Sequence, residues 1–393
     1  MRCSEWKEIA LGDVCTTISD TIKKNEFENV VLINTSDVLL GKVLNHILEP
    51  NKNLKGQFKK KFKQNDILYS EIRPKNGRFA FVDFDSTGYI ASTKLMVIRC
   101  NEKLVVPSFL YGVLKSSSVI DELQSLAETR SGTFPQITFR ELANIEIKLP
   151  SINEQKQIAK ILSSIDDKIE LNNKINDNLE QQAQAIYDDF LIANNTVTVP
   201  ISELVDVRDG THDSPKAHSV GYPLVTSKHL KPYSVDVSSA NYISEDDYSK
   251  INERSNVETN DILLSMIGTV GLVSFVSDNH TLFAIKNVAL FRTSQAPDYK
   301  YYLLCYLKSK LSKDYIEVNL AGSTQKYVSL GALRKMPIEK PSFDTLQQLN
   351  IMLFPLIDKI IANSAEIEKL AQLRDTLLPK LMSGEIDVSK VEI

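Results

Sequence analysis

Two stretches of the chain carry apolar residues at alternating intervals of four and three positions. The first runs from Ile158 to Phe190 and the second from Leu349 to Leu381, so the second stripe lies 191 residues after the first. Such spacing places the apolar residues on one face of a helix, and a stripe longer than four heptads is typical of a coiled coil. The pattern predicts two long helices that pack through these stripes.

An asparagine occupies the same position of both stripes, Asn172 in the first and Asn363 in the second. An Asn buried in an apolar seam costs stability and can fix the register of the helices. We expect both residues to set the register, the alternative being that both face solvent on a bent or frayed segment. Pro355 lies inside the second stripe, and an interior proline removes a hydrogen bond. We therefore expect the C-terminal helix to begin separately or to bend near Phe354.

The segment between the two stripes repeats the segment before the first. "NDILYSEI" at residues 65–72 returns as "NDILLSMI" at residues 260–267, an offset of 195. "LGDV" at residues 11–14 matches "LVDV" at 204–207, and "LKSS" at 114–117 matches "LKSK" at 307–310, both with an offset of 193. The chain is a tandem duplication whose unit is a whole domain with its exit helix, far longer than a solenoid repeat.

Each unit opens with short runs rich in β-branched and aromatic residues that are separated by turn residues. A more helical stretch opened by a proline follows, then a glycine loop and a strand-like run that ends near another proline. This order predicts a mixed α+β domain, made twice. The expected divisions are a first domain at 1–150, a central helix at 151–195, a second domain at 196–341, and a C-terminal helix and tail at 342–393.

Composition is ordinary for a soluble globular protein, with 42% apolar and 24% charged residues. The four cysteines form no C-x-x-C pair, so neither a disulfide framework nor a zinc site is indicated. No apolar run approaches a membrane span, and the N-terminus lacks a signal-peptide core, so we expect a cytoplasmic protein. The net charge of −4 argues mildly against a nucleic-acid partner, but "KGQFKKKFK" at residues 55–63 is strongly basic.

Motifs that suggest catalysis fail when the two copies are compared. "VRDGTHDSPK" at residues 207–216 gathers Asp209, His212 and Asp213, but the first unit has "CTTISDTIKK" in the matching place. A polar loop that touches a ligand is favoured there, with a plain turn as the alternative and a metal or acid–base site less favoured. Glu71, which could form a nuclease-like carboxylate set, is replaced by Met266 in the second copy. No glycine pattern for a nucleotide is present. We expect a binding protein without catalytic residues or a metal site.

Two similar domains with different polar loops, held apart by helices, suit recognition of two half-sites on duplex DNA. Lysine and arginine would contact phosphates, and short polar side chains of the loops would contact phosphates or base edges. The candidates in the first unit are Lys59, Lys60, Lys61, Arg73, Lys75, Arg78, Ser131, Thr133 and Gln136. The candidates in the second unit are Thr211, His212, Asp213, Ser214, Lys216, Lys228, Ser323, Thr324, Gln325, Lys326 and Arg334. Each of them taken alone is more often solvated surface.

Two further strings resemble a known family. "LPSINEQKQIAKIL" at residues 149–162 and "LLPKLMSGEIDV" at residues 377–388 are similar to the two shared regions of specificity subunits of type I restriction-modification enzymes. The duplication and the "DGTHDSP" loop resemble that family as well. The second helix entry, "KPSFDTLQQL", lacks the pair found at Glu154 and Gln155, and the first unit lacks the "DGTH" loop.

The resemblance implies an α+β fold of two target-recognition domains with pseudo-twofold symmetry, separated by two antiparallel coiled-coil helices. Each domain would read one part of a bipartite, asymmetric DNA site, and the helix length would set the gap. The chain would bind no cofactor itself. Two modification subunits using S-adenosylmethionine would dock on the helices and methylate flipped adenines, and restriction subunits using ATP and Mg²⁺ would complete the nuclease.

Four apolar residues outside the helix seam are candidates for docking those partners, and the alternative for them is packing against the chain's own domains. They are Ile161, Ile175, Ile351 and Ile361. Two other functions stay open. One is a protein-binding scaffold, which salt-insensitive association without DNA affinity would favour. The other is a stand-alone methyltransferase or nuclease, which S-adenosylmethionine binding or DNA cleavage by the isolated chain would support.

Overall fold

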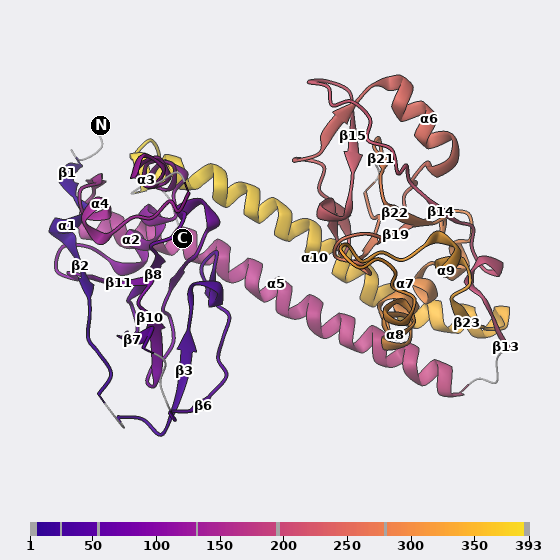
Figure 1. Ribbon diagram of the computed structural model, residues 1–393, viewed down its shortest axis with the longest axis horizontal. Helices are drawn as coiled ribbons and strands as arrows, with labels where there is room; N and C mark the ends of the chain where they lie inside the picture. The colour runs from indigo at the N-terminus through magenta and orange to yellow at the C-terminus, as the bar shows by residue number, and fades with distance from the viewer. Residues whose placement is uncertain are drawn as a thin grey trace. The chain divides into compact units, whose positions relative to one another are not determined.

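The computed structural model of the protein describes residues 6–23, 26–52, 56–130, 133–193, 197–278 and 281–388. The chain divides into two compact units, which are Met1–Lys168 with Leu370–Ile393 (unit 1) and Ile169–Lys369 (unit 2). Two long helices, α5 (Ile152–Ala193) and α10 (Phe343–Ser383), each contribute residues to both units (Figure 1). The divisions between the compact units therefore fall inside these helices, whereas the sequence pattern placed the domain limits at the helix ends.

Unit 1 contains two four-stranded sheets, a strand pair and a hairpin. The first sheet has the order β2 (Cys15–Ile18), β11 (Leu95–Cys100), β8 (Ile67–Ser70) and β9 (Phe79–Phe81). The second has the order β6 (Glu49–Pro50), β3 (Asn29–Ile33), β10 (Tyr89–Ser92) and β7 (Phe58–Lys61). The strand pair is β1 (Lys7–Ala10) with β12 (Glu146–Leu149), and the hairpin is β4 (Val38–Leu39) with β5 (Lys42–Val43). The helices are α1 (Leu11–Val14), α2 (Pro107–Leu114), α3 (Ser117–Arg130) and α4 (Phe139–Ala143), and the 3-10 turns are η1 (Thr35–Asp37) and η2 (Pro74–Asn76).

Unit 2 repeats this plan. Its first sheet has the order β14 (Val207–Asp209), β22 (Val288–Phe291), β19 (Ile262–Ser265) and β20 (Val273–Phe275). Its second has the order β18 (Asn241–Ile243), β15 (Tyr222–Val225) and β21 (Ala284–Ile285). The strand pair is β13 (Val197–Pro200) with β23 (Pro337–Lys340), and the hairpin is β16 (Leu230–Lys231) with β17 (Ser234–Val235). The helices are α6 (Glu245–Ser255), α7 (Lys300–Lys308), α8 (Lys310–Val318) and α9 (Leu330–Arg334), and the 3-10 turns are η3 (Ile201–Glu203), η4 (Ser227–His229) and η5 (Pro297–Tyr299).

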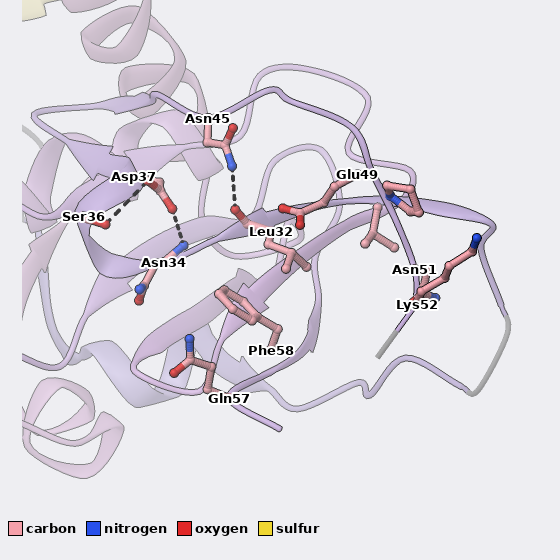
Figure 2. Close-up of a pocket in the computed structure, with 12 residues that line it drawn as sticks. Leu32, Asn34, Ser36, Asp37, Asn45, Glu49, Asn51, Lys52, Gln57 and Phe58 are labelled. Atoms are coloured by element: carbon pink, nitrogen blue, oxygen red, sulfur yellow. Dashed lines mark hydrogen bonds between the residues drawn. The ribbon is translucent and has the colours of Figure 1, made fainter. Parts of the chain in front are cut away.

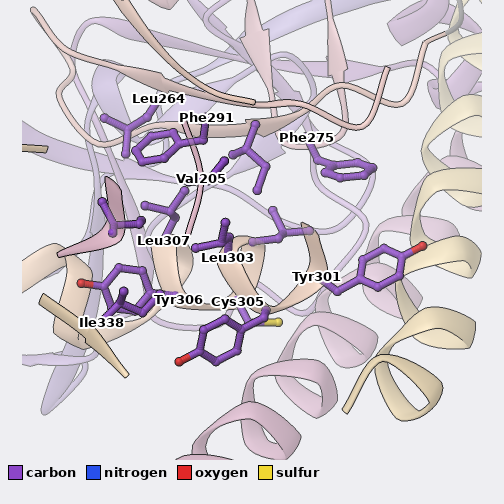
Figure 3. Close-up of a cluster of buried hydrophobic side chains, with 14 of the residues drawn as sticks. Val205, Leu264, Phe275, Phe291, Tyr301, Leu303, Cys305, Tyr306, Leu307 and Ile338 are labelled. Carbon is purple, nitrogen blue, oxygen red and sulfur yellow. The ribbon is translucent and has the colours of Figure 1, made fainter. Parts of the chain in front are cut away.

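The repeated "NDIL" segment leads into an apolar strand, because the central strand of each unit is buried on both faces. Successive side chains of a strand point to opposite faces. In unit 1, Ile67 packs into a core shared with the helices, whereas Leu68 packs into a core shared with the second sheet. Ile262 and Leu263 divide in the same way in unit 2. The helix-facing core of unit 2 is drawn in Figure 3, where Leu264 and Phe291 of the sheet and Leu303 and Leu307 of α7 are labelled.

The first two residues of the repeated segment are turn residues. Asn65 and Asn260 have positive φ values of 70° and 72°, a conformation that Asn tolerates better than most residues. Asp66 accepts a hydrogen bond from the Lys63 amide and Asp261 accepts one from the Glu258 amide, each at 2.8 Å. Asp66 is also held by a bidentate ion pair with Arg99, at 2.7 and 2.6 Å. Both buried aspartates therefore have structural partners.

The predicted seam is present on both long helices. Its apolar positions are buried or half-buried along α5 and α10. Within unit 2 the helices are antiparallel, because Asn172 contacts Glu366 while Asn176, one turn later on α5, contacts Asn363, an earlier residue of α10. Within unit 1, Asp166 of α5 accepts a hydrogen bond from Arg374 of α10 at 3.1 Å, which continues the same antiparallel order. The predicted α+β fold with a long antiparallel helix pair is confirmed.

The two seam asparagines are 1% and 2% exposed, so the alternative that they face solvent is wrong. They do not contact each other in the way a facing pair would. Asn172 donates to the Glu366 carboxylate at 2.8 Å, and Asn363 donates to Asn176 Oδ1 at 2.9 Å. A buried side-chain amide that is hydrogen-bonded across the seam disfavours a shift of one helix along the other, because the shift would leave the amide without a partner. Its role in register stays a prediction.

The expected separate start of the C-terminal helix near Phe354 is wrong. Helix α10 begins at Phe343 and continues through Pro355 to Ser383. Pro355 has no amide hydrogen to donate to the carbonyl of Ile351, four residues earlier. Ile351 and Pro355 both lie on the exposed side of the helix, where water can bond that carbonyl. The apolar seam on the opposite side holds the helix together across the missing bond.

Candidate nucleic-acid interface

Three loops meet at one edge of each unit. In unit 1 the Glu71 amide donates to the Lys94 carbonyl at 3.0 Å, and the Ile137 amide donates to the Glu71 carbonyl at 2.9 Å. In unit 2 the same bonds join Met266 to Asn287 at 3.2 Å and Val328 to Met266 at 3.0 Å. Both units therefore bring together the loop after the central strand, the turn before its neighbour strand, and the glycine loop.

In unit 1 this edge gathers three of the predicted residues. Arg73, whose φ is 43°, donates through its guanidinium to the Thr133 carbonyl at 3.4 Å. Gln136 accepts a hydrogen bond from the Lys94 ammonium at 3.2 Å, and Lys94 also lies 3.5 Å from the Glu71 carboxylate. Ser131 lies outside the described residues. Lys94 was not predicted from the sequence, although its position immediately before a repeated strand, matching Asn287 in the second copy, could have revealed it.

The predicted basic run at Lys59, Lys60 and Lys61 does not act as one patch. Lys59 is exposed, but the Lys60 ammonium donates to the Thr93 carbonyl at 3.0 Å and the Leu95 carbonyl at 2.7 Å. Burial lowers the pKa of Lys60. Lys61 lies 2.8 Å from the Glu26 carboxylate. Because the ammonium groups of Lys60 and Lys61 are already bonded, only Lys59 of this run presents an exposed charge for phosphate.

Of the other two predicted cations of unit 1, Lys75 lies within η2 and Arg78 follows it. The Lys75 ammonium pairs with Asp121 at 2.9 Å, and both side chains are exposed, so solvent screens the pair. Arg78 donates to the carbonyls of Ser36 and Val38 at 3.0 and 3.2 Å. These bonds fix the guanidinium beside the β4–β5 hairpin while leaving part of it accessible.

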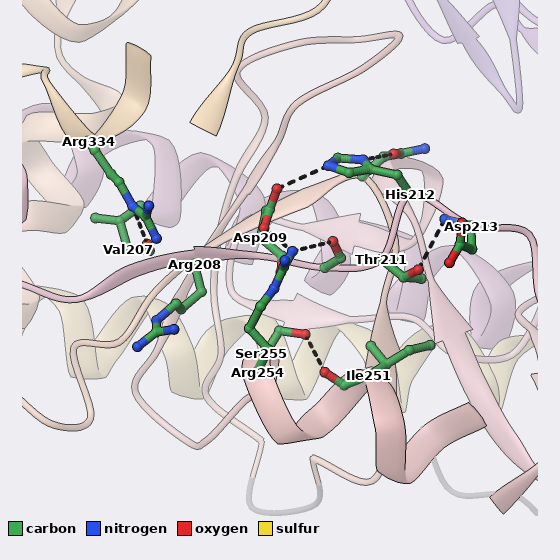
Figure 4. A network of polar contacts seen from close by, with 12 residues as sticks. Val207, Arg208, Asp209, Thr211, His212, Asp213, Ile251, Arg254, Ser255 and Arg334 are labelled. Atoms are coloured by element: carbon green, nitrogen blue, oxygen red, sulfur yellow. Dashed lines mark hydrogen bonds and ion pairs between the residues drawn. The ribbon is translucent and has the colours of Figure 1, made fainter. Parts of the chain in front are cut away.

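In unit 2, Arg254 of α6 contacts the "DGTHDSP" loop and holds it in place (Figure 4). Asp209 is buried and forms an ion pair with Arg254, which also donates to the carbonyls of Asp209 and Gly210 at 3.2 and 3.3 Å. His212 Nε2 lies 3.0 Å from the second Asp209 oxygen, and its Nδ1 lies 2.8 Å from Asn287 Oδ1. Asp209 is therefore a brace for the loop and is not free to act as a base.

The exposed part of this loop presents small polar groups. The Thr211 hydroxyl accepts a hydrogen bond from the Asp213 amide at 3.0 Å, and Lys286 donates to the Ser214 hydroxyl at 2.6 Å. Gly210 is required because a Cβ there would lie 2.0 Å from the Ile285 carbonyl oxygen. Among the described residues, no group of His, Cys, Asp and Glu is arranged to hold a metal ion.

The remaining predicted residues of unit 2 fall into two groups. Ser323, Thr324, Gln325 and Lys326 are exposed on the glycine loop, which is closed by two backbone hydrogen bonds of 2.9 Å between Ala321 and Tyr327. Lys216 and Lys228 are exposed as well. Arg334 instead donates to the Val207 carbonyl at 2.9 Å and holds α9 against β14. Arg254, Lys286 and Asn287 were not predicted, because they lie far along the chain from the loop residues that they contact.

A groove of about 460 Å³ in unit 1 lies apart from these loops (Figure 2). Its lining includes residues of β3, β6 and β7 and of the η1 turn. Asn45 donates to the Leu32 carbonyl at 2.8 Å, beyond the residues of β3 that pair with β6. Asp37 accepts from the Asn34 amide at 2.8 Å and caps η1, so these polar groups of the groove are already bonded within the unit.

The four predicted docking residues have different surroundings. Ile161 packs against the helix-facing core of unit 1, and Ile361 packs against that of unit 2. Ile175 is half-buried, and Ile351 is 73% exposed. Only Ile351 therefore presents most of its side chain to a partner, and partner binding by all four stays a prediction.

None of the helices in the described part of the chain combines the length and the apolar character that a membrane span requires.

Residues 3–181 and 194–372 each match the family model of the type I restriction modification DNA specificity domain. The chain belongs to this family. It is 31% identical to the type I restriction enzyme HindI specificity subunit of Haemophilus influenzae, over 98% of this chain and 100% of that protein. It is 27% identical to the MjaIX specificity subunit of Methanocaldococcus jannaschii, over 73% of this chain and 71% of that protein.

A solved structure supports the fold. The crystal structure of the type I restriction-modification system S subunit from M. genitalium matches with a TM-score of 0.53 at 17% identity, covering 96% of each chain. Family membership confirms the resemblance noted in the sequence. It also confirms that the chain is a specificity subunit and not a catalytic one.

Proposed function

We propose that this specificity subunit reads a bipartite, asymmetric DNA site, with each unit contacting one half. The observation that supports this most strongly is that the same three-loop edge is present in both units. Both units tie the same three loops together with equivalent backbone bonds, yet unit 1 places Arg73, Lys94 and Gln136 there, while unit 2 places His212 and Asn287. A shared frame with different polar side chains suits two different base sequences.

The long helices serve two purposes in this proposal. Their seam sets the number of unread base pairs between the half-sites, and Asn172 and Asn363 keep the pairing in register. Modification subunits dock on exposed apolar positions of the helices, of which Ile351 is the most exposed of the four predicted. The restriction subunits join through this assembly. S-adenosylmethionine, ATP and Mg²⁺ are used by the partners, and the complex works in the cytoplasm.

The test is to co-express the chain with its modification subunit, purify the complex, and map methylated adenines by single-molecule sequencing. A split motif with a constant gap is the expected result. Arg73→Ala should relax the motif on one side of the gap, and His212→Ala should relax it on the other side. Relaxation of the same side by both variants would contradict the assignment of one half-site to each unit.

The isolated chain offers a second test. With a net charge of −4, it should bind duplex DNA weakly and with strong salt dependence, and should gain sequence-specific binding only with the modification subunits. Affinity can be measured by fluorescence anisotropy at two salt concentrations. An assembled complex without DNA affinity or methylation would move the function toward the scaffold alternative.

A further inference from the structure

Leu40 occupies an unfavourable position at the tip of the β4–β5 hairpin. Its φ is 43°, and the next residue, Gly41, has a φ of 102°. Positive φ at both central residues matches the two-residue hairpin turns that prefer Asn-Gly. A leucine in this conformation is strained, because its Cβ crowds the backbone. The tip therefore holds a residue that backbone geometry alone would not select.

The side chain of Leu40 gains little from the core in return, since it is 73% exposed. A lone exposed leucine is common on protein surfaces. Leu40 differs because the strain and the exposure fall on the same residue. Strained positions persist where function requires the side chain.

The surrounding backbone holds Leu40 in a defined place. Its amide donates to the Gly77 carbonyl at 2.8 Å, and the Gly41 amide donates to the Phe79 carbonyl at 2.9 Å. A Cβ on Gly77 would lie 2.6 Å from Leu40 Cδ2, so the glycine makes room for the leucine side chain. The tip is built to present an apolar group in one position.

Two cations lie on the segments bonded to this hairpin. Lys75 belongs to the turn that ends at Gly77, whose carbonyl bonds the Leu40 amide, and Arg78 donates to the carbonyls of Ser36 and Val38. An apolar tip with cations beside it suits a polyanionic ligand whose groove exposes apolar groups, because the cations can contact the anionic groups while the tip contacts the apolar ones. The major groove of duplex DNA admits a two-stranded ribbon and displays the thymine methyl group.

We propose that Leu40 contacts a thymine methyl group in the half-site read by unit 1, while the neighbouring cations contact phosphates. This inference rests on the proposed function of the chain. It assigns base recognition to a hairpin that lies outside the three-loop edge. Unit 1 would thus read DNA through one polar and one apolar element.

The experiment uses the full chain in complex with its modification subunits and a duplex that carries the methylation-mapped site. The variant is Leu40→Asn, because Asn accepts positive φ and removes the apolar group. Ile47→Asn is the matched control, since Ile47 is 75% exposed and is not among the positive-φ residues. The dissociation constant is measured for each protein on the parent duplex and on duplexes with single thymine-to-uracil changes.

We expect Leu40→Asn to weaken binding of the parent duplex by on the order of tenfold, a size typical of one base contact. One thymine-to-uracil change should weaken wild-type binding and leave the Leu40→Asn complex unaffected. Relief of strain should raise the Tm of unit 1 by roughly 2–4 °C. This combination of a more stable protein with weaker binding would not arise from a purely structural leucine.

Several results would overturn the inference. They are a fall in Tm for Leu40→Asn, equal losses for Leu40→Asn and Ile47→Asn, or no thymine whose methyl group matters to the wild type. Loss of assembly with the modification subunits would assign Leu40 to a protein contact. If the wild-type complex itself shows no specific DNA binding, the proposed function fails as well. If it binds specifically and Leu40→Asn binds equally well, only this inference fails.

Discussion

The β4–β5 hairpin of unit 1 and the β16–β17 hairpin of unit 2 are the same element placed 192 residues apart, yet their tips behave differently. Both follow a capped 3-10 turn, and the amide of Leu44 bonds the Asp37 carbonyl as the amide of Asp236 bonds the His229 carbonyl. The tip of unit 2 is Pro232–Tyr233 where unit 1 has Leu40–Gly41. Pro232 and its counterpart Leu40 are both exposed, Leu40 to 73%, whereas Tyr233 is only 4% exposed and its counterpart Gly41 has no side chain.

The difference extends to the helices. In unit 2, Tyr233 accepts a hydrogen bond from Lys308 at 2.9 Å and places its ring 4.2 Å from that ammonium, which also bonds Glu180 of α5. Lys231 and Ser234 of the same hairpin contact Glu368 of α10 at 3.3 and 2.7 Å. The unit 2 hairpin is therefore fastened to both long helices.

Unit 1 keeps the lysine but changes its aromatic partner. Lys115, the counterpart of Lys308, lies over the ring of Tyr111 in α2 at 5.1 Å and bonds Asp166 of α5 at 3.0 Å. The hairpin approaches Tyr111 at Gly41, whose missing side chain allows the Tyr111 hydroxyl to come close. Two changes of residue at the turn, Leu40 to Pro232 and Gly41 to Tyr233, thus separate a hairpin that exposes an apolar tip from one that is fastened to the helices by an aromatic side chain.

The largest expected effect comes from removing the aromatic residue that fastens the unit 2 hairpin. Tyr233→Ala should lower the free energy of unfolding of unit 2 by about 3–5 kcal/mol, the usual cost of deleting a buried aromatic ring. Urea denaturation followed by circular dichroism measures it. Leu40→Ala is the matched control at the other tip and should change stability by less than about 0.5 kcal/mol. Similar losses from both variants would erase the contrast between the two hairpins.

Gly41→Ala tests how unit 1 accommodates its tip. The new Cβ would adopt a φ of 102° and lie 2.6 Å from the Tyr111 hydroxyl, so we expect a loss of about 1–3 kcal/mol from strain and overpacking. In a Tyr111→Phe background the overpacking is relieved, and the loss should shrink by about 1 kcal/mol. A double-mutant cycle of unfolding free energies measures this coupling. Strictly additive losses would show that the Tyr111 hydroxyl does not limit residue 41.

The two equivalent lysines should differ when each is replaced by methionine. Lys308→Met removes a bond to Glu180 and a bond to the buried Tyr233 hydroxyl, so a loss of about 1 kcal/mol is expected after allowance for solvent screening. Lys115→Met should cost less than about 0.5 kcal/mol, because Asp166 keeps its bond to Arg374. Thermal denaturation of both variants measures the difference. A larger loss for Lys115→Met would reverse the comparison.

The smallest effect concerns acid sensitivity at the unit 2 hairpin. Hydrogen bonds from the Ser238 side chain and amide, with help from Lys231, lower the pKa of Asp236 to about 2. A carboxyl with a depressed pKa stabilises the fold above its ordinary value of 3.8, and this contribution is lost as the pH falls toward about 2. Ser238→Ala should raise the pKa of Asp236 and move the loss to higher pH, which carboxyl NMR titration can follow. Unit 1 has Leu44 at this position and no such titration. An unchanged pKa in Ser238→Ala would contradict this cause.

The internal repeat made much of the fold predictable. The strands that carry "NDIL", the proline-opened helices and the paired seams all form where the pattern places them, because their burial repeats with the local period. The separate helix start expected at Pro355 was wrong, since the strength of the seam that holds α10 together is a property of packing. At the site, Arg73, Thr133 and Gln136 were predicted and meet, whereas Arg254 and Lys94 were missed because they approach their partners only after folding.

The sequence by itself determined the family, the duplication and the helix seams, because each of these is written in local order and spacing. Tertiary structure alone decided which polar residues are free. It bonded Lys60 to backbone carbonyls, paired Asp209 with Arg254, buried Tyr233 and left Leu40 exposed. The physical reason is that the availability of a side chain depends on what lies within a few ångströms of it, and those neighbours come from distant parts of the chain.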